Sequence, residues 1–132
     1  MAQIKAYLMF GGNCLEAMTF YKQCFGGEFD CMTYENSPMP IPDDVRSKIM
    51  HSRLKNHSLE LMAADDVQHK SVHSGNMVTL NVTCGSQEEI KRIFKGLSQG
   101  GRVTMPLQDT FWGSKFGTLT DKYGIKWMLN CD

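Results

Sequence analysis

Histidine and carboxylate side chains are the groups of this chain that could take part in acid–base chemistry or bind a metal. His51 falls in an alternating stretch in which Ile49, His51 and Arg53 are expected to face the open side of a sheet. An imidazole titrates near neutral pH and could act as a general base, but no carboxylate lies near His51 in the sequence to orient it. We therefore interpret His51 as part of a binding-site wall, with catalysis as the less favoured alternative.

A second group of such side chains consists of Asp65, Asp66, His69 and His73. The two histidines are spaced so that a helix would present both on one side, where they could bind zinc. The stretch lacks the apolar periodicity of a helix, however, and it ends in Ser-Gly. We interpret it as a solvated linker.

The five cysteines are scattered along the chain, and no two of them form a C-x-x-C pair. Their odd number and their spacing favour neither a disulfide framework nor a zinc site, so we expect reduced thiols that mostly fill the core. Cys31 and Cys131 have no cationic or histidine neighbour in sequence that would activate a nucleophilic thiolate.

Alternation along the predicted strands places further side chains on the same open face as His51. Trp112 and Phe116, at and after an exposed Thr-Phe-Trp-Gly turn, are candidates for a pocket rim or a dimer contact. The predicted ligand-binding residues are Tyr7, Met9, His51, Glu60, Met62, Thr79, Asn81, Trp112, Phe116, Met128 and Asn130. Such a wall suits an apolar or planar ligand, although part of the ten methionines would simply fill the core.

The elements that would position these residues repeat along the chain. Strands are predicted over residues 4–10, 28–34, 48–54, 58–63, 77–84, 102–107, 115–120 and 125–131. Two helices are expected to begin at capping boxes, Asn13 with Glu16 and Ser86 with Glu89, and each to end at a pair of glycines. The loop 35–47 contains three prolines, and its length is typical of a lid beside a cleft mouth.

The same order of elements in both halves predicts a duplicated α+β fold. Two βαβββ modules, residues 1–66 and 75–132 of a single domain 1–132, would form a curled eight-stranded mixed sheet cleft with two helices on its convex face. Function would reside in the cleft. Trp127 alternates with Met128 and is expected to point toward the helices.

The charges of the chain restrict its partners. Fourteen basic and fourteen acidic residues give a net charge of zero, so no electrostatic attraction draws the protein to nucleic acid or to an anionic membrane. No apolar run reaches the length of a membrane span, and the N-terminus is too weakly apolar for a signal peptide. We expect a cytoplasmic protein with a small-molecule partner, and open strand edges without net charge favour a homodimer.

Three stretches resemble the PhnB-like branch of the glyoxalase, bleomycin resistance and dioxygenase superfamily, also called vicinal oxygen chelate proteins. They read YLMFGGNCLEAMTFYKQCFGGE, KIMHSRLKN and VTMPLQDTFWGSKFGTLTDKYGIKWMLNCD. The resemblance covers nearly the whole chain. It implies paired βαβββ modules and a homodimer with pockets near the subunit junction.

Metal-dependent members of that superfamily bind their ion through four ligands, commonly histidines and glutamates. The resemblance assigns these positions to Lys5, Glu60, Met77 and Met128 here. A cationic lysine and two thioethers are poor ligands for a hard divalent ion, so only Glu60 could contribute. We therefore expect neither the family metal site nor a cofactor.

These observations favour a protein that binds a partly apolar metabolite or antibiotic in a dimeric cleft. One alternative is a glyoxalase-like isomerase, lyase or dioxygenase, with His51 and Glu60 as candidate catalytic residues and an ion held by Glu60 with other ligands. Another is a dimeric scaffold without a ligand. Some similar chains carry the label of a demethylubiquinone methyltransferase, which we do not favour because the glycine-rich turn and parallel sheet of the common methyltransferase type are not evident.

Overall fold

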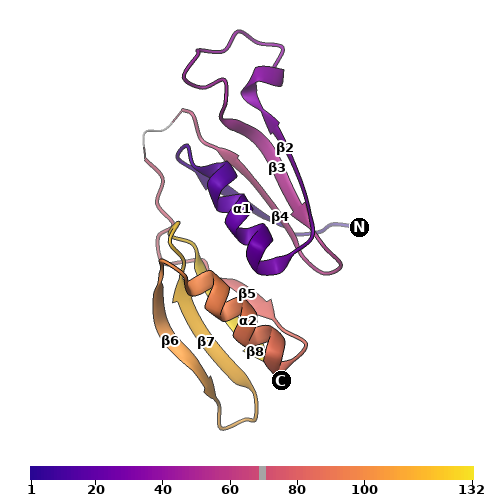
Figure 1. Ribbon diagram of the computed structural model, residues 1–132, viewed down its shortest axis with the longest axis vertical. Coiled ribbons are helices and arrows are strands. Elements are labelled where there is room, and N and C mark those ends of the chain that lie inside the picture. Colours follow the sequence, from indigo (N-terminus) through magenta and orange to yellow (C-terminus); the bar gives the residue numbers. More distant parts are fainter. Residues whose placement is uncertain (69–70) are drawn as a thin grey trace. The chain divides into compact units, whose positions relative to one another are not determined.

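The computed structural model describes residues 1–68 and 71–132, which form two compact units, Met1–Val72 and His73–Asp132 (Figure 1). Each unit contains one α-helix and one four-stranded sheet in the order strand, helix and three strands. The predicted pair of βαβββ modules is therefore confirmed, and the eight strands are divided between two sheets. Neither α-helix of the described chain is long and apolar enough to cross a membrane.

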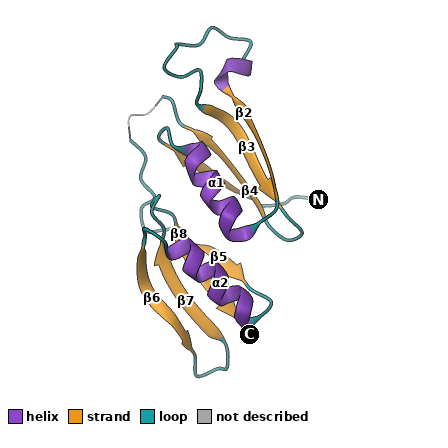
Figure 2. Cartoon of the chain, in the orientation of Figure 1, coloured by secondary structure: helices purple, strands orange, loops and turns teal. Residues whose placement is uncertain are grey.

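The two units share one topology (Figure 2). The first consists of β1 (Ala6–Phe10), α1 (Cys14–Phe25), β2 (Glu28–Thr33), a short 3-10 helix η1 (Tyr34–Asn36), β3 (Ile49–Lys55) and β4 (Glu60–Asp65). The second consists of β5 (Leu80–Thr83), α2 (Gln87–Ser98), β6 (Arg102–Asp109), β7 (Lys115–Thr120) and β8 (Lys126–Cys131). The strand orders are β1-β4-β3-β2 and β5-β8-β7-β6, and only the first pair of each is parallel.

One face of each sheet is covered by the helix of its own unit, and the core lies between them. The apolar stripes of the helices are buried there, as the helical spacing predicts. They consist of Cys14, Ala17, Met18, Tyr21 and Cys24 in α1 and of Ile90, Ile93, Phe94 and Leu97 in α2. Trp127 is 1% exposed, which confirms its predicted place in the core. The opposite face of each sheet has no helix of its own unit over it.

The N-termini of the two helices are capped in different ways. Ser86 Oγ accepts from the Glu89 amide at 3.1 Å, and Glu89 Oε1 accepts from the Gly85 amide at 2.8 Å, which confirms the predicted capping box of α2. The box predicted at Asn13 is wrong, since its side chain makes no capping hydrogen bond and its backbone, with φ −116° and ψ 28°, is not extended as a capping residue requires.

Asp65 takes the place of that missing cap from the end of β4. Its Oδ1 accepts from the amides of Gly12 at 3.0 Å and Cys14 at 2.9 Å, and its Oδ2 accepts from the Ile49 amide at 2.9 Å. The side chain is buried, at 2% exposure. A carboxylate at the start of a helix also interacts favourably with the helix dipole. Asp65 therefore joins α1 to β3 and β4 instead of belonging to a solvated linker.

A side-chain turn of one kind closes the last hairpin of both units. Asp121 Oδ1 accepts from the amides of Tyr123 at 2.8 Å and Ile125 at 3.1 Å, while its Oδ2 accepts from Trp127 Nε1 at 2.8 Å. In the first unit Asn56 Oδ1 accepts from the amides of Ser58 at 3.2 Å and Leu59 at 3.1 Å. The spacing of Asp121, Gly124 and Trp127 in the sequence therefore reflects the hydrogen bonds by which Asp121 closes this turn.

Some predicted boundaries are wrong. The strand expected over residues 77–84 is limited to β5, and Met77 is 95% exposed. Its partner β8 begins at Lys126 and Leu80 is paired with Trp127, so Met77 and Val78 have no β8 residue opposite them. Thr79 lies just before the strand, not within it.

Candidate functional site

The open face of the first sheet gathers one aromatic, one imidazole and several thioether side chains. Tyr7 and Met9 on β1 are 44% and 46% exposed, and Met32 on β2 is 46% exposed. His51 is exposed on β3, and Met62 is half-buried on β4. Strand alternation brings together Tyr7, Met9, His51, Glu60 and Met62 as expected, and their role as ligand contacts stays a prediction.

A bulge explains the one difference on this face. The ladder between β2 and β3 pairs Met32 with His51 but Thr33 with Ile49, so Met50 is an extra residue. The extra residue turns Ile49 to the helix side, where it is 1% exposed. The expectation that Ile49 shares the open face with His51 is therefore wrong.

Tyr7 supplies the partner that sequence reasoning did not find for His51. The Tyr7 hydroxyl lies 3.0 Å from His51 Nδ1, and the ring centroids are 5.7 Å apart. The two strands are not neighbours; β4 runs between them, and Ala64, the β4 residue paired with Met9, has only a methyl group to fill the space. Sequence reasoning looked for a carboxylate and so missed a phenol 44 residues away.

The environment of Tyr7 keeps its phenol protonated. Burial raises the pKa of Tyr7 above its ordinary value of 10.0, and the nearby Cys14 and Tyr34 raise it further. A protonated phenol is a better donor than acceptor, and the sp² nitrogen of a neutral imidazole is a good acceptor. This chemistry favours Tyr7 O–H as the donor to His51 Nδ1, whereas the 3.0 Å geometry alone fits either tautomer of His51.

Glu60 forms an ion pair with Lys5, the residue directly before β1. Lys5 Nζ lies 2.7 Å from Glu60 Oε2. The hydrogen bond from Lys5 lowers the pKa of Glu60, burial opposes this, and the charges of Lys5, Lys55 and Arg53 lower the pKa further. Two of the four positions that the resemblance assigned to metal ligands are thus an ammonium and a carboxylate that pair with each other.

The other two positions that the resemblance assigned to metal ligands are methionines, which are poor ligands for a hard ion. Met77 lies in the exposed segment before β5, and Met128 is half-buried on the open face of the second sheet. Over residues 1–68 and 71–132, no three histidine, cysteine, aspartate or glutamate side chains are grouped so that they could hold an ion. Of the predicted Asp65 to His73 group, His69 lies outside the described residues.

The open face of the second sheet carries uncharged hydrogen-bonding groups. Asn81 Nδ2 donates to Thr83 Oγ1 at 3.3 Å, and Thr83 Oγ1 donates to Asn130 Oδ1 at 3.1 Å. Between β6 and β7, Thr104 Oγ1 lies 2.6 Å from Thr118 Oγ1. Strand pairing places Asn81 beside Met128 and Asn130 beside Phe116. Alternation therefore predicted Asn81, Met128 and Asn130 on one face, whereas Phe116 was expected only as a rim or dimer contact and Thr83, Thr104 and Thr118 were missed.

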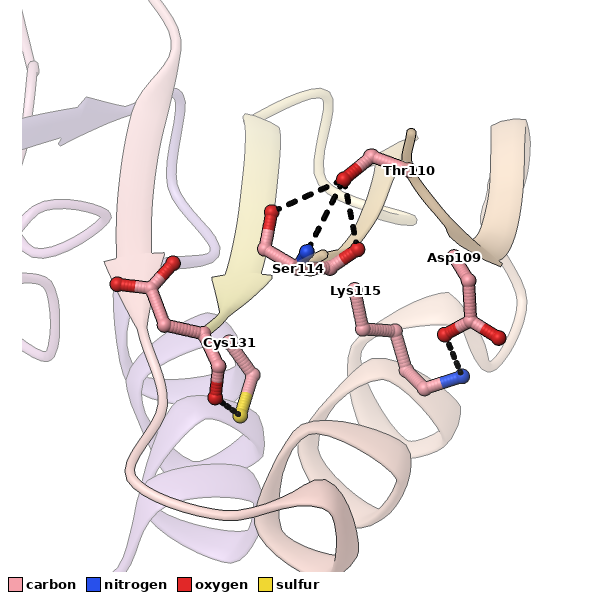
Figure 3. A network of polar contacts seen from close by, with 6 residues as sticks. Asp109, Thr110, Ser114, Lys115 and Cys131 are labelled. Atoms are coloured by element: carbon pink, nitrogen blue, oxygen red, sulfur yellow. Dashed lines mark hydrogen bonds and ion pairs between the residues drawn. The ribbon is translucent and has the colours of Figure 1, made fainter. Parts of the chain in front are cut away.

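The hairpin between β6 and β7 presents two exposed aromatic rings. Phe111 is 97% exposed and Trp112 is 63% exposed, and their rings meet edge to face at 4.8 Å. Thr110 fixes the turn, since its Oγ1 donates to the Ser114 carbonyl at 2.9 Å and accepts from the Ser114 amide at 3.1 Å (Figure 3). The pair is held outward by its turn, and its role as a rim or dimer contact stays a prediction.

The loop 35–47 folds around a hollow of its own. The hollow has a volume of about 230 Å³ and is lined by Glu35, Ser37, Met39, Pro40, Ile41 and Arg46. Its base is closed by the hydrogen bond from the Glu35 amide to the Arg46 carbonyl, 3.1 Å. The role of the loop as a lid stays a prediction.

The five cysteines form no disulfide within the described chain, and burial disfavours the thiolate form of two of them. Burial raises the pKa of Cys14 to about 12 and that of Cys84 to about 11. A thiol with so high a pKa is a weak nucleophile at neutral pH. Cys14 instead packs at the start of α1, with its sulfur 3.7 Å from Ser52 Oγ.

Comparison with known proteins agrees with this architecture. A family model described as 3-demethylubiquinone-9 3-methyltransferase matches residues 2–130. The crystal structure of protein PA1353 from Pseudomonas aeruginosa is 40% identical, with a TM-score of 0.88, and the match covers 100% of this chain and 98% of that one. A PhnB protein from Bacillus cereus, given the same methyltransferase description, is 31% identical with a TM-score of 0.74, over 99% of this chain and 100% of that one.

A more distant neighbour shares the fold alone. It is a glyoxalase/bleomycin resistance protein/dioxygenase family enzyme from Burkholderia phytofirmans, 16% identical with a TM-score of 0.64 over 96% of each chain. The match to the family model extends over nearly the whole chain. The chain therefore belongs to this PhnB-like family of proteins with the glyoxalase/bleomycin resistance fold.

Proposed function

We propose that the chain is a small-molecule-binding protein whose ligand lies on the open face of the first sheet. The observation that carries this proposal is the half-exposed set of Tyr7, Met9 and Met32 beside the Tyr7–His51 hydrogen bond. Apolar groups on an uncovered sheet face are costly in water, and thioethers adapt to ligands of varied shape. A polar pair within an apolar surface is the common composition of a ligand site.

The Lys5–Glu60 ion pair supports binding without the family metal. The ammonium lies against the carboxylate that would otherwise be a ligand for a divalent ion. A cation approaching Glu60 would also meet the positive charges of Lys55 and Arg53, which act on the same carboxylate.

A screen of thermal stability against metabolites and divalent ions is expected to give hits among partly apolar small molecules and none among the ions. A ligand at a hundred times its dissociation constant stabilises the fold by about 2.7 kcal/mol. Metal analysis after purification without chelator is the control. A stoichiometric divalent ion would favour a metal-dependent enzyme instead, and the absence of any hit would favour a scaffold.

The methyltransferase activity named in the family description has less support in this chain. A nucleotide-containing cofactor commonly uses the free amides at the start of a helix after a glycine-rich turn. Here the amides of Gly12 and Cys14 are already bound by Asp65. Titration calorimetry tests whether the protein binds S-adenosylmethionine. Specific binding would support the methyltransferase function.

We also propose that the protein is a homodimer in which Trp112 is a contact. Two exposed rings on a rigid hairpin tip are a typical anchor for a protein interface. Trp112→Ala is expected to shift a dimer burying more than about 1,000 Å² toward monomer in sedimentation at micromolar concentration. Leu15→Ala, which removes an apolar side chain 49% exposed on α1, is the matched control and is expected to leave the dimer intact. A wild-type species of monomer mass would refute the dimer.

A further inference from the structure

We propose that His51 and Arg53 form a two-donor site for a carboxylate or similarly shaped oxyanion on the open face of the first sheet. This inference deepens the proposed function and rests on it. It assigns the ligand a class, namely a small molecule with an oxyanion beside an apolar portion.

The contact between Tyr7 and His51 links the donor of the hydrogen bond to the tautomer of the imidazole. With the Tyr7 hydroxyl assigned as the donor to Nδ1 across 3.0 Å, a neutral His51 holds its proton on Nε2. His51 is exposed on β3. The imidazole therefore offers an N–H donor to a ligand on the open face, and Tyr7 acts as a positioning residue for it.

Arg53 stands next to that donor. It is two residues along β3 and points to the same face, about 6.7 Å away by strand geometry, a span that the long arginine side chain can shorten. Within the described chain Arg53 forms no ion pair, although the edge strand places Asp30 opposite it. A planar guanidinium binds carboxylates through two parallel hydrogen bonds.

Two carboxylates lie on the strands next to these donors: Asp30 on β2, opposite Arg53 and without an ion pair to it among the described residues, and Glu60 on β4, which is already used. Glu60 on β4 is bound to Lys5 at 2.7 Å. The hydrogen bond from Lys5, followed by the charges of Lys5, Lys55 and Arg53, lowers the pKa of Glu60, so this carboxylate is ionised and occupied by Lys5. A ligand group with free acceptors and negative charge complements this part of the face.

The strand register defines what lies on either side of the oxyanion. Met32 is paired with His51 across β2, and Met62 is paired with Arg53 across β4. Each donor therefore has a thioether on one neighbouring strand, and Arg53 has Asp30 on the other. A carboxylate attached directly to a flat apolar group would place its oxygens on the donors and its apolar portion on the methionines.

Benzoate and benzamide are matched probes, because they share a shape and differ in charge. In spectra of the ¹⁵N-labelled protein, benzoate is expected to shift the His51 and Arg53 signals saturably, and benzamide to bind at least about tenfold more weakly. Arg53→Gln is expected to weaken benzoate binding at least about tenfold. Lys55→Gln, which removes the same charge from the same strand, is the control, with a change of at most about twofold.

A second readout tests the positioning role of Tyr7 without any ligand. Long-range ¹H–¹⁵N spectra are expected to show His51 protonated on Nε2 in the wild type and a mixture of tautomers in Tyr7→Phe. A proton on Nδ1 in the wild type would overturn the inference. So would equal affinities for the two probes, equal effects of Arg53→Gln and Lys55→Gln, or no shift with benzoate at about 10 mM.

These outcomes separate the inference from the proposed function. If benzamide or another neutral compound binds the open face as well as benzoate, the proposed binding function stands and the oxyanion site fails. If neither probe binds and the metabolite screen gives no hit, both fail.

Discussion

Replacing Asp65 by alanine is expected to lower the free energy of unfolding by about 3 kcal/mol, because three backbone amides would lose their acceptor. Those amides belong to Gly12, Cys14 and Ile49, and the carboxylate that binds them is 2% exposed. A loss of that size is a large part of the total stability of a small domain. Urea denaturation followed by far-ultraviolet circular dichroism measures it.

Two further variants make that result specific. Asp65→Asn keeps one acceptor oxygen but turns an amide donor toward a backbone N–H, so an intermediate loss is expected. Asp43→Ala removes an exposed carboxylate whose ion pair with Arg46, 2.9 Å, lies at the surface, and it is expected to cost less than about 1 kcal/mol. Similar losses for Asp65→Ala and Asp43→Ala would contradict the capping role.

The second large effect is expected for Asp121→Asn, at about 2 kcal/mol of stability. The asparagine would keep an oxygen for the amides of Tyr123 and Ile125 but would place an NH₂ group against Trp127 Nε1, which now donates at 2.8 Å. Both donor groups would be buried, since Asp121 is 3% exposed and Trp127 is 1% exposed. The loss of one hydrogen bond is therefore accompanied by an unpaired donor.

Tryptophan fluorescence reports on this change directly. The chain has two tryptophans, so in a Trp112→Phe background the emission comes from Trp127 alone. Denaturation of Asp121→Asn in that background is expected at a lower urea concentration. Asp109→Asn, which alters an exposed ion pair with Lys115, is the control and is expected to move the midpoint little. Equal midpoints for the two variants would argue against the Asp121–Trp127 bond.

Sequence reasoning succeeded wherever the determining contacts are local. Ser86 and Glu89 of the capping box are three positions apart, and the box forms as predicted. Alternation within regular strands also placed Tyr7, Met62 and Asn81 on the open faces, because a strand turns its side chains with a period of two.

It failed wherever a distant segment decides the local structure. Asn13 with Glu16 fits the same capping pattern as Ser86 with Glu89, yet Asp65 fills that position from 51 residues beyond Cys14. The bulge that turns Ile49 inward depends on the pairing of β3 with β2. The partner of His51 comes from β1, 44 residues away. None of these contacts leaves a periodic signal in the sequence near the residue that it affects.

The two kinds of cap have a consequence for the order in which the chain acquires structure. The cap of α2 needs only residues that leave the ribosome together, since donor and acceptor are three positions apart. The cap of α1 cannot form until Asp65 has been synthesised and β4 has paired with β1. That pairing places Asp65 beside Phe10. Contacts between distant residues form later because closing a long loop costs entropy. Although the halves share a topology, the first is expected to become stable only as a whole, whereas the second can begin from its helix.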